Sequence, residues 1–544
     1  MQFKKLSSGH WLVLLVTLLL TTPIWVLVSF LFVPSNDNWT HLAGTLLPEY
    51  IANSIWLMLG VSFGTLILGI PAAWLISHYD FKFRRIFQWA LLLPLAMPAY
   101  IIAYTYTGLL AFEGPVQTEL RQHYGFGVSQ WFPEIRSLGG AILMFSLVLY
   151  PYVYLLARGA FSSQGEAIFH VSRTLGVSPT QSFFRVALPM ARPAIIAGLS
   201  LALMETLADF GTVQYFGVDT FTTGIFRTWT GLGDTKTTAQ LSVLLLVFVL
   251  ILMLVEYWSR NRAKYFSNFQ HSKNPPSKIH LHGIKAGLAI AFLSLPILLG
   301  FVIPSGQLLY WSYHTAEQGI SLHFFELIWN SFSLAFIAAL VTLMLALLLA
   351  YSRRMIPHPI LTPTLRIATL GYAVPGTIIA VAVMIPFTWI DNQLDAWMRD
   401  QFDISTGLLL SGTLIALIFA YSFRFLSIAL QTLDSGLGQI KPSMDQSART
   451  LGASHWSLLS RIHLPLLKSS LLIATILVFV EVLKELPTTL IMRPFNFDTL
   501  AVNAYELAAD EQLADAGLPA LLIVLTGIIP VIILSKLIDS KGRP

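Results

Sequence analysis

Ser172-Arg173-Thr174-Leu175-Gly176 and Ala448-Arg449-Thr450-Leu451-Gly452 are two copies of one short stretch of this chain. The copies lie 276 residues apart, measured from Gly176 to Gly452. A Leu-Pro pair follows each glycine at the same distance and ends at Pro189 in one copy and at Pro465 in the other. Matching internal spacing over such a distance indicates two copies of one structural unit.

The composition indicates a membrane protein. Apolar residues make up 55% of the 544 residues and charged residues only 11%, whereas an ordinary soluble domain carries roughly 25% charged residues. So little charge cannot cover the surface of a soluble chain of this length. The sequence has no cysteine, which excludes disulfides, thiolate metal sites and a cysteine nucleophile.

Apolar runs of about 20 residues, each long enough to cross a bilayer as a helix, occur twelve times. We therefore predict an all-α polytopic membrane protein with twelve transmembrane helices, arranged as two parallel six-helix repeats. The predicted spans are Trp11–Val33, Ile51–Ser77, Gln88–Leu110, Leu138–Ala157, Pro193–Val213, Ala239–Trp258, Lys285–Ile303, Trp329–Tyr351, Ile367–Ile390, Gly407–Phe423, Ser469–Ile491 and Gly517–Leu534. No small-residue cleavage site follows the first span, so we expect it to be retained.

The distribution of basic residues predicts the orientation. With both termini in the cytoplasm, 26 of the 33 Lys and Arg residues fall in cytoplasmic segments, six in outer loops, and Lys484 within a span. This asymmetry fits the positive-inside rule. Six helices per half return the chain to its starting side, so both repeats have the same orientation.

The halves divide as residues 1–260 and 285–544, with a polar, basic cytoplasmic linker at 261–284. Each half carries one cytoplasmic loop of the doubled stretch, at 166–190 and 440–466. The linker histidines His271, His280 and His282 could suggest a metal site, but no structured framework surrounds them, so we interpret the segment as a solvated tether.

Each loop is predicted to fold as a helix, a sharp turn and a short helix. Gly176 and Gly452 fit the left-handed turn that ends a helix. Ser178 is a good N-cap, with Pro179 at the first helical position and Gln181 completing a capping box. Ser454 is the cap of the second copy. We expect Pro189 and Pro465 to end the short helices before the next span.

The short helices carry apolar and aromatic side chains on the cytoplasmic side. Such a surface needs a partner, unless it lies on the membrane or packs under its own bundle. Because the feature occurs twice, we expect a two-lobed partner. The residues are Phe183, Phe184 and Val186 in one copy, and Trp456, Leu458, Leu459 and Ile462 in the other.

These loops resemble the E-A-A loops of permease subunits in binding-protein-dependent ABC importers. The Gly, the Leu-Pro and their spacing match, whereas the first three motif positions are His170-Val171-Ser172 and Gln446-Ser447-Ala448. The missing Glu affects any role that needs its charge, but not the shape of the loop. The resemblance covers essentially the whole chain and implies two fused permease units, a pseudo-dimer like that of type I importers.

The resemblance implies that each loop docks on one copy of an ABC ATPase subunit. The sequence contains no phosphate-binding P-loop, so we expect ATP and Mg on the partner ATPases, no cofactor in this chain, and no enzyme activity of its own. The expected coupling residues are Arg173, Gly176, Ser178, Pro179, Phe183, Phe184, Arg185 and Pro189 in the first loop, and Arg449, Gly452, Ser454, His455, Trp456, Arg461 and Pro465 in the second.

Ionisable residues also occur within apolar spans, where they indicate function unless they are paired or solvated. Glu205 and Asp209 share one helix face, as do Glu481 and Glu485, with Lys484 beside them. These carboxylates could line a pathway and make transient contact with a hard cation such as Fe(III). Alternatively, Lys484 neutralises a neighbouring Glu, and the others cap broken helix ends near Gly211 and Pro487.

The stretches 204–212 and 481–489 resemble fused permeases of ferric iron importers, although related permeases carry thiamine or a phosphonate. The family implies a bacterial inner membrane location and a periplasmic substrate-binding protein, for which the acidic last outer loop (Glu506, Asp510, Glu511, Asp515) is a candidate surface. We predict an Ala-rich amphipathic helix there, within 501–516. Two rival classes stay open: a secondary transporter driven by an ion gradient, and an intramembrane enzyme.

Overall fold

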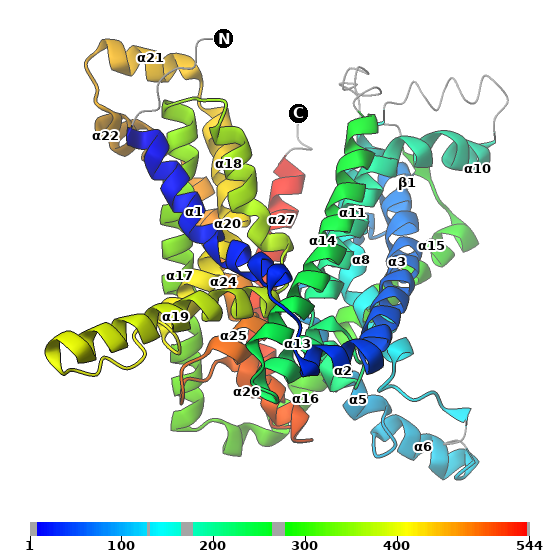
Figure 1. Ribbon diagram of the computed structural model, residues 1–544. Coiled ribbons are helices and arrows are strands. Elements are labelled where there is room, and N and C mark those ends of the chain that lie inside the picture. Colours follow the sequence, from blue (N-terminus) through cyan, green and yellow to red (C-terminus); the bar gives the residue numbers. More distant parts are fainter. Residues whose placement is uncertain (1–7, 128–130, 165–177, 264–277, 541–544) are drawn as a thin grey trace. The chain divides into compact units, whose positions relative to one another are not determined.

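The computed structural model describes residues 8–127, 131–164, 178–263 and 278–540 (Figure 1). Within these ranges the regular secondary structure is helical, apart from one short parallel strand pair, β1 (Tyr79–Asp80) and β2 (Ile279–His280). The chain divides into two compact units. Unit 1 comprises residues 1–40, 225–243 and 320–503, and unit 2 comprises 41–224, 244–319 and 504–544.

Unit 1 contains the first helix of the chain and most helices of the second repeat. These are α1 (Ser8–Ser29), α17 (Leu322–Met355), α18 (Leu361–Ala368), α19 (Gly376–Phe402), α20 (Leu414–Gln439), α21 (Pro442–Thr450), α22 (His455–Leu458), α23 (Leu464–Leu466), α24 (Lys468–Leu483) and α25 (Pro487–Met492).

Unit 2 contains most helices of the first repeat and the first and last helices of the second. These are α3 (Leu47–His78), α4 (Arg84–Ala90), α5 (Ala99–Leu110), α6 (Pro115–Tyr124), α8 (Leu138–Ser163), α10 (Pro179–Ser182), α11 (Leu188–Ala208), α12 (Gly211–Tyr215), α15 (Gly283–Ile297), α16 (Ile303–Gly319) and α27 (Gly517–Ser540). Four helices span a unit boundary: α2 (Asp37–Thr45), α13 (Phe221–Thr230), α14 (Thr235–Ala263) and α26 (Leu500–Ala509).

The compact units therefore differ from the sequence halves, because the first helix of each repeat is exchanged. In unit 1, α1 packs on α18 and α19. Its contact stripe includes Val13, Leu20 and Leu27, which are fully or almost fully buried and recur at a helical spacing. In unit 2, α16 packs on α27 and α5, and α15 packs on α3. The domain boundaries drawn from the sequence stay a prediction.

Many helices are long and apolar enough to cross a membrane. Among the described residues nine helices qualify by length and composition, and up to eleven if each of two bent helix pairs counts as one span. A further apolar helical stretch, Gly517–Ile533, is shorter. The chain is thus a multi-pass membrane protein, and the count of twelve crossings is not established by these helices.

One predicted span in each repeat is interrupted in the same way, by a 3-10 turn followed by a proline. Pro98 and Pro375 lie at the starts of α5 and α19, each after a 3-10 turn, Leu93–Ala96 or Thr369–Ala373. Proline removes one backbone donor and disfavours helical conformation in the residue before it. In unit 2, the segments on either side of the break meet at 89°. The predicted uninterrupted spans 88–110 and 367–390 were therefore wrong at these points.

The prediction that Pro189 ends a short helix was also wrong. In both repeats a π-helical turn, Phe183–Ala187 or Leu459–His463, joins the short helix to the next helix. In unit 2 the helix continues through Pro189, directly after the π-helical turn, into the membrane span. In unit 1 the bend, of 74°, comes at Leu467, just beyond Pro465.

The end of the linker is anchored within unit 2. Ile279 and His280 pair as a strand with Tyr79 and Asp80. The Nδ1 atom of His280 lies 3.4 Å from a carboxylate oxygen of Asp80, which also pairs with Arg84. His271 lies outside the described residues.

Candidate functional site

The first loop of the doubled stretch is described from Ser178 onward, so Arg173 and Gly176 lie outside the described residues. The capping box is confirmed. The Ser178 backbone N–H donates to the Gln181 side-chain oxygen, and the Gln181 N–H donates to the Ser178 hydroxyl, both at 3.3 Å. Helix α10 begins at Pro179, as predicted. These bonds satisfy N–H groups that have no partner inside a helix.

The second loop shows the predicted turn in full. Helix α21 is followed by Gly452 in the left-handed region, with φ of +82°, and its N–H donates to the carbonyl of Arg449 at 3.0 Å. Only glycine takes this conformation at low steric cost. Ser454 then caps α22 by accepting the N–H of Ser457 at 3.2 Å.

The apolar side chains of both short helices are divided between the bundle and the solvent-exposed surface. Phe183 stacks near Trp74, with ring centroids 4.9 Å apart, and Leu458 packs fully buried against Met355. By contrast, Phe184 is 61% exposed and Trp456 is 73% exposed. In each unit the neighbouring helices therefore cover the inner side chain, whereas Phe184 and Trp456 stay exposed. The other candidate coupling residues that are exposed are Ser178, Arg185, Pro189, Arg449, Gly452, Ser454, His455, Arg461 and Pro465.

A buried polar cluster, which the sequence did not reveal, holds the second loop in place. Arg354, at the end of α17, pairs through Nε with Asp445 of α21 at 2.8 Å. The other carboxylate oxygen of Asp445 lies 2.8 Å from Nε2 of the fully buried His463. Arg354 also donates to the carbonyls of Leu437 and Ile440, at the end of α20. One guanidinium thus joins two membrane helices to the loop, an arrangement suited to transmitting movement.

These contacts shift the pKa of the Asp445 carboxyl group. Burial alone would raise its pKa, but hydrogen bonds from Arg354 and His463 outweigh that effect, and the net result is a lowered pKa. Two further contacts tie the loop to α17. The hydroxyl of Tyr351 donates to the carbonyl of His455 at 2.6 Å, and Arg449 approaches the sulfur of Met355 at 3.4 Å.

The intramembrane carboxylates lie where helices break, and the first break is at Asp209. Helix α11 ends at Ala208, and the Asp209 side chain caps α12 by accepting the N–H groups of Thr212 and Val213 at 2.9 and 3.3 Å. The Thr212 hydroxyl donates to the second oxygen at 3.0 Å. The Thr222 hydroxyl donates to the Asp209 carbonyl at 2.7 Å.

Glu485 occupies the same position in the second repeat. It accepts N–H bonds from Thr488 and Thr489 at 3.0 and 3.1 Å, and both threonine hydroxyls donate to it as well. Arg424 of α20 adds an ion pair at 2.9 Å, with both side chains largely buried. Arg424 directly follows the predicted span Gly407–Phe423 and so fell in a predicted cytoplasmic segment. Its place between Phe423 and Phe425 in an apolar run was the available signal.

The structural alternative is therefore observed for these residues: Asp209 and Glu485 are caps, and Lys484 pairs with Glu481 at 2.9 Å. Glu205 and Glu481, one turn before the caps, are half-buried. The two pairs fall in different units. Among the described residues, no group of three or more His, Cys, Asp or Glu side chains could hold a metal ion.

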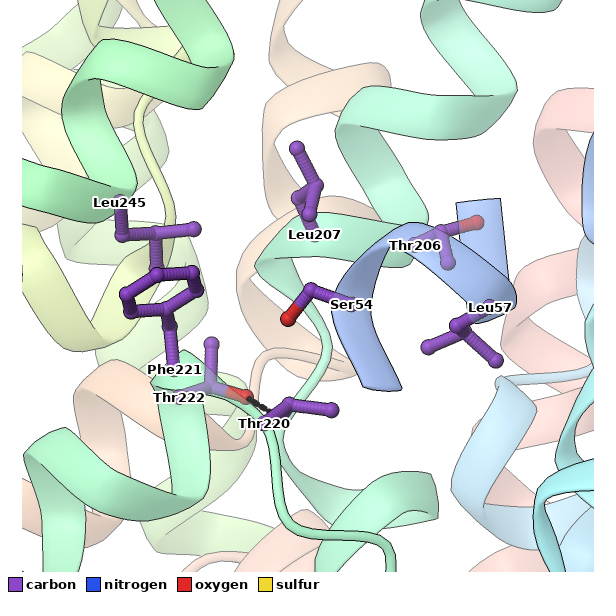
Figure 2. A pocket seen from close by; sticks show the side chains of 8 residues that line it. All are labelled: Ser54, Leu57, Thr206, Leu207, Thr220, Phe221, Thr222 and Leu245. Atoms are coloured by element: carbon purple, nitrogen blue, oxygen red, sulfur yellow. Dashed lines mark hydrogen bonds between the residues drawn. The ribbon is translucent and has the colours of Figure 1, made fainter. Parts of the chain in front are cut away.

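A small pocket lies beside the first break, in unit 2 (Figure 2). It is lined by Ser54, Leu57, Thr206, Leu207, Thr220, Phe221, Thr222 and Leu245. Its threonine hydroxyls are already engaged: Thr206 donates to the carbonyl of Ala202, and Thr220 and Thr222 bond to each other. Because the lining contains no acidic side chain, this pocket is poorly suited to a cation.

The segments that follow the breaks are fixed in the same way in both repeats. Asn53 donates to the carbonyl of Asp219 at 2.9 Å, and Asn330 donates to that of Asp498 at 3.3 Å. Of the stretch 501–516, predicted to be an amphipathic helix, only the first part is helical, as α26, which ends at Ala509. One acidic side chain of this segment is already paired, because Arg136 forms an ion pair with Glu511 at 2.8 Å.

A multi-pass helical chain with two matching loops and two matching helix breaks is a membrane component of a transport system built from duplicated units. Comparison with known families agrees: the family described as "Binding-protein-dependent transport system inner membrane component" matches residues 65–265 and again 343–543. The chain belongs to this family, and the predicted family and its two-fold repeat are confirmed.

Among individual relatives, the chain is 26% identical over 491 residues to the Fe(3+)-transport system permease protein FbpB 2 of Haemophilus influenzae, covering 90% of both chains. It is 26% identical to the ferric transport system permease protein FbpB of Actinobacillus pleuropneumoniae, covering 84% of this chain and 66% of that one. The molybdenum transport system permease protein ModB of Haemophilus influenzae is 26% identical over 39% of this chain and 93% of its own length.

Proposed function

We propose that this chain is the permease of an ATP-driven importer that moves ferric iron from a periplasmic binding protein to the cytoplasm. The observation that carries the proposal is the end-to-end similarity to a ferric permease, which covers 90% of both chains. The molybdenum relative, in contrast, aligns with 39% of this chain. The acidic residues near both helix breaks also suit a cation better than an oxyanion.

In the proposed topology the chain crosses the inner membrane twelve times, with both termini in the cytoplasm. The concentration of Lys and Arg in the corresponding segments supports this orientation. Helix length and composition support nine to eleven of these crossings, and Gly517–Ile533 would supply the last as a shorter helix.

Two copies of an ATPase subunit would dock on the two loops, one on each, and bind ATP and Mg. Phe184 and Trp456 are suitable docking side chains, because both are aromatic and exposed beside a helix fixed to the bundle. Closure of the ATPase pair would then pull on α21 and, through Asp445 and Arg354, on α17 and α20. A periplasmic binding protein would deliver the substrate on the opposite face.

Along the pathway we assign transient contact with ferric iron to Glu205 and Glu481. Asp209 and Glu485 lie four residues later. They would mainly cap the helices that follow the breaks, because threonines already donate hydrogen bonds to their carboxylate oxygens. Carboxylate oxygens suit a hard cation, and weak, brief binding suits a conduit.

Uptake by the reconstituted complex tests this function. Proteoliposomes that hold the permease with its ATPases, supplied with the binding protein and ATP, should accumulate ferric iron. Molybdate, thiamine or a phosphonate accumulating in its place would assign another substrate to the same machinery. Uptake that persists with inactivated ATPases would favour a secondary transporter, and turnover by the purified chain alone would favour an enzyme.

A further inference from the structure

Helix α19 continues well beyond the span predicted for it. The predicted span ends at Ile390, but the helix runs to Phe402 and the chain then turns back through residues 403–413. We call residues 389–413 the α19 arm. In Figure 1 the arm extends away from the other helices of unit 1, at a wide angle to α17.

The arm is a built structure held together by two aspartates. Asp391, only 1% exposed, accepts the N–H groups of Leu410 and Ser411 at 3.0 and 2.7 Å. One turn later, Asp395 accepts those of Thr406 and Gly407 at 2.8 and 3.1 Å. These bonds fasten the returning chain to one face of the helix, so the arm keeps a defined shape.

A different face of the helix carries an apolar stripe. Ile390, Leu394 and Trp397 follow each other at helical spacing and are 41%, 36% and 54% exposed. Asn392 and Arg399 lie on another side of the same helix and are exposed as well. The returning chain adds three exposed apolar side chains: Ile404, Leu408 and Leu409. The helix is therefore amphipathic, and its apolar stripe stays uncovered in the described part of the chain.

We propose that the α19 arm lies in the outer headgroup region of the bilayer, with the stripe of Ile390, Leu394 and Trp397 turned toward the acyl chains. The arm continues, without a break, a helix that starts at Gly376 inside the membrane-spanning unit. The lipid surface is thus contiguous with the surface already embedded. Tryptophan is enriched at this boundary, and amphipathic helices bind there through their apolar face.

This placement gives the arm a mechanical role. The first part of α19, Gly376 to Val383, is buried among other helices. An anchored arm would hold that part at a fixed depth while neighbouring helices move. This role does not depend on which substrate is carried.

Site-directed spin labelling tests the proposal, because the natural chain has no cysteine. Trp397→Cys and Leu394→Cys would be labelled one at a time in the full transporter in lipid nanodiscs, with Asn392→Cys and Arg399→Cys as matched controls on the same helix. The proposal predicts that labels at 397 and 394 collide more with oxygen than with a water-soluble nickel chelate. Labels at 392 and 399 should show the reverse.

Equal access of the nickel chelate to all four positions would overturn the proposal. So would protection of 394 and 397 that arises only on adding the periplasmic binding protein, because that pattern assigns the stripe to a protein partner. A second measurement avoids cysteine variants. Brominated lipids should quench the fluorescence of the natural protein more than that of a Trp389→Phe, Trp397→Phe variant, and equal quenching would contradict the proposal.

Discussion

Asp209 and Glu485 show how one position can have the same local role in both repeats and a different environment in each. Both side chains cap a short helix after a break. Glu485 additionally neutralises the largely buried Arg424, whereas Asp209 is held by threonine and backbone donors. Removal of the two carboxylates should therefore lower the folding stability by different amounts.

Asp209→Ala removes a helix cap, which typically costs about 0.5–2 kcal/mol. Glu485→Ala should cost more, roughly 3–5 kcal/mol, because it also leaves a buried guanidinium unpaired. Thermal unfolding of the two variants in nanodiscs measures the difference. Adding Arg424→Met to Glu485→Ala should recover part of the loss. Equal destabilisation by the two single variants would show that the ion pair contributes nothing.

Asp234 provides a pH-dependent contribution at the start of α14. Burial alone would raise its pKa, but hydrogen bonds from Asn38, Thr237 and Asn36 outweigh it and lower the pKa to about 2. Because the pKa of Asp234 is lower in the folded protein, its contribution to folding stability is complete above its pKa in the unfolded chain, about 3.9. The contribution is lost as the pH falls toward 2.

Asp234→Asn should therefore lower the melting temperature at pH 6 and flatten its fall between pH 4 and 2. Melting curves of natural and variant protein across this range check the prediction. A variant that keeps the natural pH dependence over this interval would rule out the assigned role.

Local residue patterns predicted the caps correctly, since Ser178, Ser454 and Gly452 act through neighbours within a few residues. Arg354 and Arg424 could not be placed from the sequence. Their partners lie 91 and 61 residues away along the chain, and only the packing of separate helices brings them together.

At the scale of elements, the doubled loop depends on one backbone conformation. Gly452 has φ of +82° with open space around it, so a side chain there meets no atom and only backbone strain counts. Gly438, near the end of α20, is equally open but has no positive φ. The two glycines form a matched pair.

Gly452→Ala should distort the turn at a cost of about 1–2 kcal/mol and reduce the ATPase recovered with the purified permease. Gly438→Ala should leave recovery unchanged, because alanine favours a helix. Co-purification of the ATPase with each variant checks this. Equal recovery with both would argue against docking through the second loop.

Helix positions followed from hydropathy, but their interruptions did not. The 3-10 turns before Pro98 and Pro375 contain no charged residue and lie within apolar stretches. A break among apolar side chains does not change the mean hydropathy of a sequence window, so hydropathy cannot reveal it. The extension of α19 was missed for the converse reason: polar residues after Ile390 were interpreted as a loop, although their spacing is helical.

At the scale of the whole molecule, the duplicated sequence gives two compact units that each use helices from both repeats. Sequence similarity between the halves identifies the repeat but cannot reveal which helices pack together. Helices α1 and α15 are apolar along their length, and either half could have covered them.

Glu205 and Glu481 provide a test of the pathway that spares the helix caps. Glu205→Gln together with Glu481→Gln should lower ferric iron uptake several-fold, because a conduit for a cation loses two carboxylates and keeps the positive charge of Lys484. Complex yield should fall less than uptake. Ser62→Ala together with Ser333→Ala, in the membrane-spanning helices α3 and α17, serves as the matched control. If the double glutamine variant takes up ferric iron at the rate of the natural protein, both glutamates have only a structural role.

The most direct test of the central claim is uptake of radioactive ferric iron by proteoliposomes that contain this chain, its ATPases and the binding protein. The proposed function predicts accumulation that requires ATP and stops when the ATPases carry a hydrolysis-blocking substitution. Accumulation at the same rate with inactive ATPases, driven by an ion gradient, would contradict it.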